Sequence, residues 1–311
     1  MSRNGGGTVD ERVISAAAGM GAPTLRVGDL ELMSSYYEEA LVFEPLEERV
    51  VDGLVHRVLG RGATPLLRLV HTPDLPVAGP HQAGLFHNAF LFDDEASLSA
   101  TVLRAAQDPR SRFAGSADHL VSEAFYFTDP EGNGVELYRD RPREQWVWEE
   151  GSVRMDTIGL DPNAYLRSHV SQDALAAGAG LPGTVGHVHL QVGDLAAARA
   201  FYVDAIGFEA TLSDFPGALF VSAGGYHHHL AMNVWNSRGA GPRAASLGLA
   251  QVAVTVPGRE DLDAVTGRLR AAGVPYADDA RSVTARDPWD TLVTVALDGA
   301  TVDDLLEAPA R

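Results

Sequence analysis

Two stretches of the chain, 165 residues apart, share one pattern of apolar and polar positions. Residues 26–45 and 191–210 each read as a strand ending in Val-Gly-Asp-Leu that runs into an amphipathic helix. The apolar positions recur at the spacing of one helix face. They are Met33, Tyr36, Tyr37 and Ala40 in the first copy, and Ala198, Phe201, Tyr202 and Ala205 in the second. Asp29 and Asp194 stand where helix N-caps are expected. The shared strand end favours a repeat over two unrelated amphipathic helices.

A second, fainter pair of segments follows the first. Residues 84–92 parallel residues 248–256, and each predicts a strand followed by a helix. Residues 129–138 and 287–296 both predict a turn that opens a final strand. The chain therefore divides into four units of β, α and further β structure, which we number as modules one to four. They cover residues 20–75, 82–142, 184–238 and 246–308.

The regions outside these modules differ in character. Residues 1–19 are rich in glycine and mixed in charge, and we expect a flexible tail. Modules one and two occupy 20–142, and modules three and four occupy 184–311. The connector between them, residues 143–183, carries Trp146 and Trp148, so we expect it to pack on a module.

Composition removes several function classes. The chain of 311 residues contains no cysteine and no lysine. It has 24 arginines and 42 acidic residues, which gives a formal charge of −18. Disulfides, thiolate chemistry, Schiff-base chemistry and phosphate-loop hydrolysis are thereby excluded. The acidic balance argues against nucleic acid as a partner, and no segment reads as a signal peptide or membrane span. We expect a cytoplasmic protein whose metal, if any, is held by some of its 11 histidines and by oxygen ligands.

The segment HLVSEAFYFTDPEGNGVE, residues 119–136, carries the strongest chemical pattern. Its DPEGNG portion is typical of a tight turn, which leaves Glu136 unexplained. A carboxylate in the apolar strand that follows is costly to bury without a partner, and a metal is a natural one.

Histidines open other predicted strands. His87 lies in LFHNAFLF, and His187 and His189 are two apart in GHVHLQV, so the latter two share a strand face. A lone histidine on such a strand is more often a hydrogen-bonded core residue than a ligand. In YHHHLAMNVW, alternation places His228 opposite to its two neighbours.

Together these motifs resemble the vicinal oxygen chelate superfamily, which includes glyoxalases, bleomycin-resistance proteins and type I extradiol dioxygenases. The run from His119 to Glu136 matches the extradiol signature at its fixed positions from the histidine onward and departs upstream, at Ala117. The segments around it are most similar to the four-module bacterial catechol 2,3-dioxygenases. The resemblance implies an α+β fold of four βαβββ modules that pair into two half-barrel clefts.

The resemblance also implies a metal triad drawn from two paired modules. The matching positions are His87, His187 and Glu136, whereas modules one and four offer Ala22, Gln251 and Thr294 instead. Pairing module two with three, and one with four, gathers all three ligands in one cleft. We therefore predict one metal per chain, and two imidazoles with a carboxylate suit Fe(II), with Mn(II) as an alternative.

The implied activity is extradiol cleavage of a catechol by dioxygen to a product of the 2-hydroxymuconic semialdehyde type. Tyr126 and His119 match signature residues near the substrate oxygens, and His228 matches the acid–base histidine, although His227 and His229 remain alternatives. Two other readings stay open: a glyoxalase-type isomerase or lyase, and a metal-free binding protein. The ring substituents and any homo-oligomer are not determined by the sequence.

Overall fold

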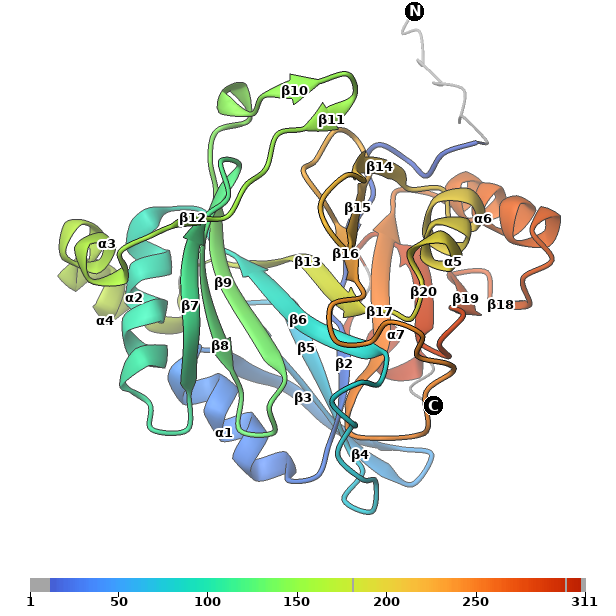
Figure 1. Cartoon of the computed structure of the whole chain (residues 1–311). Coiled ribbons are helices and arrows are strands. Elements are labelled where there is room, and N and C mark those ends of the chain that lie inside the picture. Colours follow the sequence, from blue (N-terminus) through green and yellow to red (C-terminus); the bar gives the residue numbers. More distant parts are fainter. Residues whose placement is uncertain (1–11, 181, 300, 309–311) are drawn as a thin grey trace, which may run out of the picture.

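The computed structural model describes residues 12–180, 182–299 and 301–308 (Figure 1). Each module contains one strand, one helix and three further strands, as the sequence predicts. Module one comprises β2 (Thr24–Val27), α1 (Leu30–Ala40), β3 (Glu44–Val51), β4 (Leu54–Arg61) and β5 (Thr64–His71). Module two comprises β6 (Gly84–Leu91), α2 (Glu95–Gln107), β7 (Arg112–Asp118), β8 (Ser122–Thr128) and β9 (Gly134–Asp140).

The second half of the chain has the same order of elements. Module three comprises β13 (Thr184–Gln191), α5 (Leu195–Arg199), β14 (Glu209–Leu212), β15 (Ala218–Ser222) and β16 (Leu230–Asn233). Module four comprises β17 (Gly248–Val256), α6 (Arg259–Ala271), β18 (Tyr276–Asp278), β19 (Ser282–Arg286) and β20 (Leu292–Leu297). Helix α5 continues as a π-helix, Ala200–Ala205, and a last helix, α7, spans Val302–Glu307.

The first helices of the two halves begin at the predicted aspartates. The Asp29 carboxylate accepts the backbone N–H of Leu32 at 2.9 Å, and Asp194 accepts that of Ala197 at 2.8 Å. Each bond satisfies a donor that the first helical turn leaves open. The two N-caps predicted from the repeat are therefore confirmed.

Two mixed sheets of nine strands each form the framework. One runs in the order β18-β19-β20-β17-β2-β5-β4-β3, with β1 (Gly19–Met20) paired to β17. The other runs β12-β7-β8-β9-β6-β13-β16-β15-β14, where β12 is the short strand Ile158–Gly159. Strands β6 and β13 pair antiparallel, as do β17 and β2. Modules two and three consequently share one sheet, and modules one and four share the other, within the predicted α+β class.

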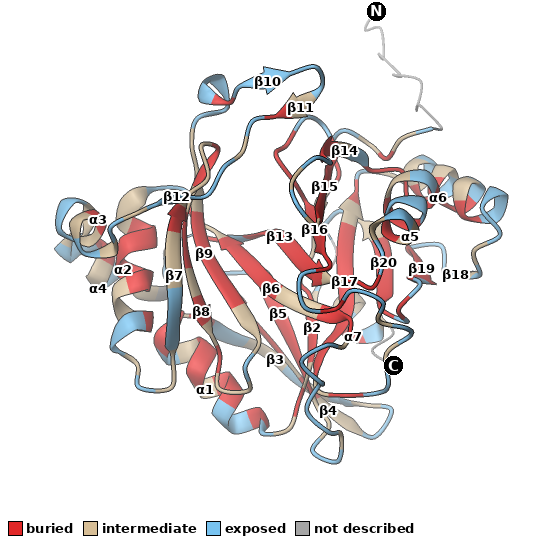
Figure 2. Ribbon diagram, in the orientation of Figure 1, coloured by how far each residue is buried: buried red, intermediate tan, exposed pale blue. Residues whose placement is uncertain are grey.

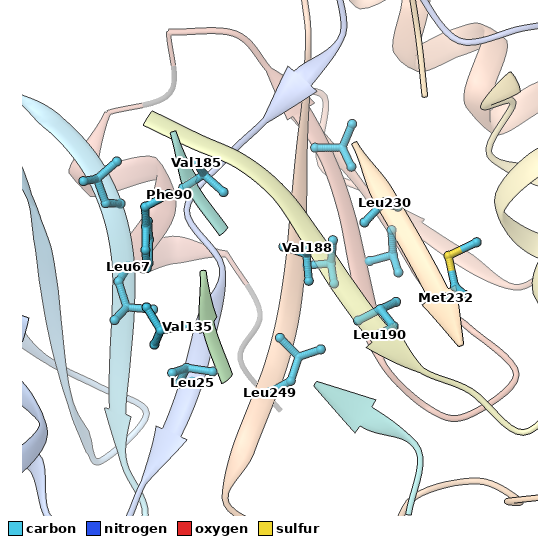
Figure 3. Packing of buried hydrophobic residues seen from close by; sticks show 14 of the residues in the cluster. Leu25, Leu67, Phe90, Val135, Val185, Val188, Leu190, Leu230, Met232 and Leu249 are labelled. Carbon is cyan, nitrogen blue, oxygen red and sulfur yellow. The ribbon is translucent and has the colours of Figure 1, made fainter. Parts of the chain in front are cut away.

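Side chains from all four modules meet in one apolar core. Figure 3 shows Leu25 and Leu67 of module one near Phe90 and Val135 of module two, with residues of β13, β16 and β17 beside them. The strands that supply them are buried along most of their length (Figure 2). Packing of this kind fixes the relative position of the two sheets.

Two equivalent hydrogen bonds also connect consecutive modules that lie in different sheets. The Tyr37 hydroxyl on α1 donates to Asp129 in the turn before β9, and Tyr202 donates to Asp287 before β20, each at 3.0 Å. All four side chains are buried. The repeat seen in the sequence thus extends to a repeated polar contact between the sheets.

Part of the expected flexible tail 1–19 is packed instead. Residues 1–11 lie outside the described residues, but Ile14 and Ala18 are buried and Gly19 pairs with Thr255. The Ile14 N–H donates to the Gly207 carbonyl at 2.8 Å, and Arg268 donates to the carbonyl of Val13. Glycine-rich composition misled the prediction here, because two apolar side chains and a few backbone bonds suffice to dock the segment.

The connector packs on both module two and module three. Trp146 is buried against Val121, Val153 and Tyr226, whereas Trp148 is exposed. Strand β12 (Ile158–Gly159) extends the sheet beside β7, and the helix α3 (Pro162–His169) buries Tyr165 against Phe125. The remaining connector elements are η1 (Arg143–Gln145), β10 (Trp148–Glu149), β11 (Ser152–Val153), α4 (Gln172–Ala177) and η2 (Gly178–Gly180). In the described part of the chain, no helix is both long and apolar enough to cross a membrane.

Candidate metal centre

Four neighbouring strands of one sheet carry the polar residues that the sequence singled out. In the order β8, β9, β6 and β13 they supply Tyr126, Glu136, His87 and His187. Tyr126 and Glu136 are direct partners across β8 and β9, while His87 lies opposite His189 across β6 and β13. Because directly paired residues project from the same face, these side chains meet on one face of the sheet.

An irregularity in β13 lies next to His187. The pairing of β13 with β6 shifts between Val185 and His187, with Gly186 between them. A Cβ added at Gly186 would lie 1.7 Å from the hydroxyl oxygen of Tyr138, so the close approach of strand and tyrosine requires glycine. A bulge of this kind changes the direction of the side chain beside it.

The side chains of His87, His187 and Glu136 converge on one point. Glu136 Oε2 lies 2.9 Å from His87 Nε2 and 3.1 Å from His187 Nε2, and the two imidazole nitrogens are 3.3 Å apart. All three side chains are buried. In residues 12–180, 182–299 and 301–308 this is the one group of three or more histidine, cysteine or acidic residues whose ligand atoms cluster in this way.

The protonation states that the surroundings favour are those of metal ligands. Burial alone would raise the pKa of Glu136, but the adjacent imidazoles of His187 and His87 hold that pKa well below its usual range. Burial lowers the pKa of His187 to about 4. An ionised carboxylate beside a neutral imidazole is the form that binds a divalent cation.

The spacing of the three atoms also fits an ion. Adjacent ligands of an octahedral ion with bonds of about 2.1 Å stand about 3 Å apart. The observed separations of 2.9, 3.1 and 3.3 Å match that value. An ion held by one carboxylate and two imidazoles would keep coordination positions for other molecules.

A cavity of about 460 Å³ opens beside the three residues. Its walls include side chains of modules two and three and of the connector. Among the apolar ones are Phe86, Val135, Met155, Phe215, Phe220 and Trp235. A volume in this range, with an apolar wall and a few polar groups, is typical of a small-molecule site.

The three residues expected to take part in catalysis line the same cavity. His119 Nε2 lies 2.7 Å from the Tyr126 hydroxyl, and His119 Nδ1 lies 2.8 Å from the backbone carbonyl of Asp156. Burial and the nearby Glu136 raise the pKa of Tyr126 well above its usual range. His228 lines the wall next to His187, with ring centroids 4.2 Å apart.

The three consecutive histidines, His227, His228 and His229, have different surroundings. They immediately precede β16, and His228 lines the cavity whereas His227 and His229 do not. His227 contacts Asp140, and His229 accepts the Ala223 N–H. Of the three histidines, His228 is therefore the one whose side chain borders the cavity.

Several residues around the cavity were not identified from the sequence. The backbone carbonyl of Asp156 and the side chain of Met155 come from the connector, and His189 lines the wall with its Nε2 bonded to Asn233. Phe215 and Trp235 line the cavity, while Phe125 packs against Tyr165. The shared strand face of His187 and His189 follows from their spacing, whereas nothing in the sequence indicates the contribution of Met155 or of the Asp156 carbonyl.

The corresponding region of the other sheet holds a hydrogen-bond network in place of ligands. Gln251 donates a hydrogen bond to Thr294 at 2.6 Å and accepts one from Arg68 at 2.9 Å. Arg68 is fully buried and also donates to Thr24 and to the carbonyls of Leu305 and Ala308, so the guanidinium contacts the C-terminal helix region. A buried cation at this place disfavours a second metal.

The fold and this site define a class of protein. The model of the Glyoxalase/Bleomycin resistance protein/Dioxygenase superfamily matches residues 19–137 and 184–298, and the chain belongs to this superfamily. Among characterised relatives, it is 34% identical over 276 residues to the catechol-2,3-dioxygenase of Bacillus subtilis (strain 168). That match covers 86% of this chain and 93% of the relative.

Solved structures agree on the fold. A putative dioxygenase from Bacillus subtilis superposes with a TM-score of 0.61 at 14% identity, covering 93% of this chain and 88% of that one. Glyoxalase I from Zea mays superposes with a TM-score of 0.56 at 18% identity, covering 94% and 95%. These likenesses show the fold alone, because one architecture can host different activities.

Proposed function

We propose that this chain is an Fe(II)-dependent extradiol dioxygenase that cleaves a catechol to a product of the 2-hydroxymuconic semialdehyde type. The observation that carries the proposal is the joint presence, in one cavity, of His87, His187 and Glu136 with the signature pair His119 and Tyr126. The similarity to a catechol-2,3-dioxygenase supports the same reading. Mn(II) suits the same ligands.

His87, His187 and Glu136 would hold the iron, which supplies adjacent binding positions for the catechol oxygens and dioxygen and a path for electrons between them. The three residues leave one side of the site free, toward the cavity. Phe86, Phe220 and Trp235 line that cavity and provide apolar surface for a ring. They also exclude water from the reacting groups.

Tyr126 and His119 orient the substrate oxygens. The Asp156 carbonyl can only accept, so His119 donates from Nδ1 and offers Nε2 as acceptor to the Tyr126 hydroxyl. The oxygen of Tyr126 then has a lone pair available for a substrate hydroxyl. His228, which also lines the cavity, would take and return a proton as general base and acid.

The direct test is to purify the protein without oxygen, load it with Fe(II), measure iron per chain and add catechol in the presence of dioxygen. We expect oxygen uptake equal to the amount of yellow ring-fission product. Glu136→Gln, which removes the ligand charge, serves as the inactive control. Stoichiometric iron with no oxygen uptake on any simple catechol would contradict the proposal and favour the isomerase alternative.

A further inference from the structure

A chain of hydrogen bonds leads away from the cavity behind His228. His228 Nδ1 lies 2.7 Å from His227 Nδ1, and His227 Nε2 lies 2.8 Å from Asp140 Oδ1. The two histidines are buried, and Asp140 ends strand β9 with a side chain 22% exposed. The cavity is thereby connected through two imidazoles to a carboxylate at the end of a strand.

The direction of these bonds follows from the groups that make them. A carboxylate can only accept, so His227 donates from Nε2. A neutral imidazole carries one N–H, which leaves His227 Nδ1 as an acceptor. His228 must then donate from Nδ1, and its own single N–H is used in that bond.

We propose that Asp140 and His227 are positioning residues that fix the tautomer of His228, so that an unprotonated Nε2 faces the cavity as the base. The inference rests on the proposed function and deepens it. It assigns to two residues outside the cavity wall the task of keeping the lone pair of His228 directed at the substrate. Similar second partners select the tautomer of other functional histidines.

Neighbouring aromatic rings hold the two imidazoles in place. His227 lies against Tyr226 and Trp146, with ring centroids 4.1 and 5.2 Å away, and Thr211 donates to its backbone carbonyl at 2.6 Å. His228 lies between His187 and Phe220, at 4.2 and 5.1 Å. A rotation of either ring would therefore require its neighbours to move.

The tautomer can be read directly by nitrogen NMR of the imidazoles, in protein loaded with Zn²⁺, a diamagnetic ion that accepts the same ligand types. Comparison with His228→Gln assigns the signals. We expect His228 to carry its proton on Nδ1 and His227 on Nε2. This readout does not depend on turnover, so the inference and the proposed function can fail separately.

Variants of the two positioning residues test the link to catalysis. His227→Phe keeps a ring but removes both hydrogen bonds, and we expect the Nδ1–H preference of His228 to be lost. The kcat with catechol should fall by about tenfold to a hundredfold, with a much smaller change in KM, because proton transfer rather than binding is affected. His227→Asn offers an amide oxygen near the position of Nδ1, so it should recover most of this loss.

Asp140→Asn keeps the shape of the side chain while making it neutral. It should weaken the preference of His227 for Nε2–H and, like His227→Phe, that of His228 for Nδ1–H. His229→Asn is the matched control in the same tripeptide and should leave kcat at neutral pH and the His228 signals unchanged. The inference is overturned if His228 carries its proton on Nε2 in the unmodified protein. It is also overturned if His227→Phe and Asp140→Asn leave the His228 tautomer as it was.

Discussion

His228 and His229 are neighbours in the chain, yet the same substitution should affect them differently, because one side chain lines the cavity and the other packs inside module three. His228→Asn retains a polar atom near Nδ1 and loses Nε2. We expect iron per chain to be unchanged and kcat to fall by roughly 10²-fold or more, the usual scale for a lost proton-transfer group.

Iron analysis and steady-state oxygen uptake on the same preparation check this prediction. Loss of iron together with activity would instead make His228 a metal ligand. A larger effect from His227→Asn than from His228→Asn would show that the acid–base group had been assigned to the wrong histidine.

His229 leads to a prediction about acid stability. Burial, followed by repulsion from the imidazoles of His227 and His187, lowers the pKa of His229 to about 3, so the folded state resists its protonation. The unfolded chain takes up this proton near pH 6.5, so the contribution of His229 to stability is lost as the pH falls below 6.5 toward 3. In His229→Asn, the fall in unfolding free energy between pH 7 and pH 5 should be smaller by about 2 kcal/mol.

Urea titrations of the two proteins at both pH values measure this difference. The amide oxygen of Asn can still accept the Ala223 N–H, so the comparison measures the titration with that hydrogen bond kept. Parallel pH curves would contradict the assignment of acid sensitivity to His229.

At the scale of elements, the segment before β1 should contribute to stability. Ile14 is 4% exposed and belongs to the main core, whereas Ile158 on β12 is 45% exposed. We expect Ile14→Ala to cost about 2 kcal/mol of unfolding free energy and Ile158→Ala less than about 0.5 kcal/mol. Chemical denaturation of the two variants decides the matter, and equal, small costs would mean that the segment is not docked.

The elements also show what local patterns can and cannot predict. Apolar periodicity and the caps Asp29 and Asp194 suffice for the helices, because helix starts depend on neighbours a few residues away. The docking of residues 12–20 depends on contacts with Gly207, Thr255 and Arg268, which are distant in sequence. No periodicity within the segment records such contacts.

The candidate site likewise contains features that the sequence predicts and features that it does not. The set His87, His187 and Glu136 was expected because a known ligand pattern matched at three positions, and the structure brings these residues together. The contact between Asp140 and His227 joins residues 87 positions apart and follows no motif. Candidate metal ligands can be predicted from a sequence, whereas the residues that orient catalytic side chains can be identified only from the packing of the folded chain.

At the scale of the whole molecule, the metal should hold modules two and three together. His87 and Glu136 lie on one side of the β6–β13 pairing and His187 on the other. Because an ion that binds only the folded state stabilises it, removal of the metal by a chelator should lower the midpoint of thermal unfolding by several degrees.

Metal analysis should find one ion per chain, since the matching region of the other sheet is filled by Arg68, Gln251 and Thr294. His187→Ala should lose the ion and unfold at the same temperature with and without chelator. Full metal retention in that variant, or a second ion per chain, would contradict this description of the two sheets.

The pairing of β6 with β13 has one more consequence. Modules one and two precede the connector, and modules three and four follow it. Taken alone, each half of the chain would therefore hold an incomplete ligand set, and the sheet edges at β2, β6, β13 and β17 would have no partner. The protein is in effect a heterodimer of two similar subunits joined by a covalent tether. If the tether were severed, association of the two fragments and capture of the ion would become a single thermodynamic event, each driving the other.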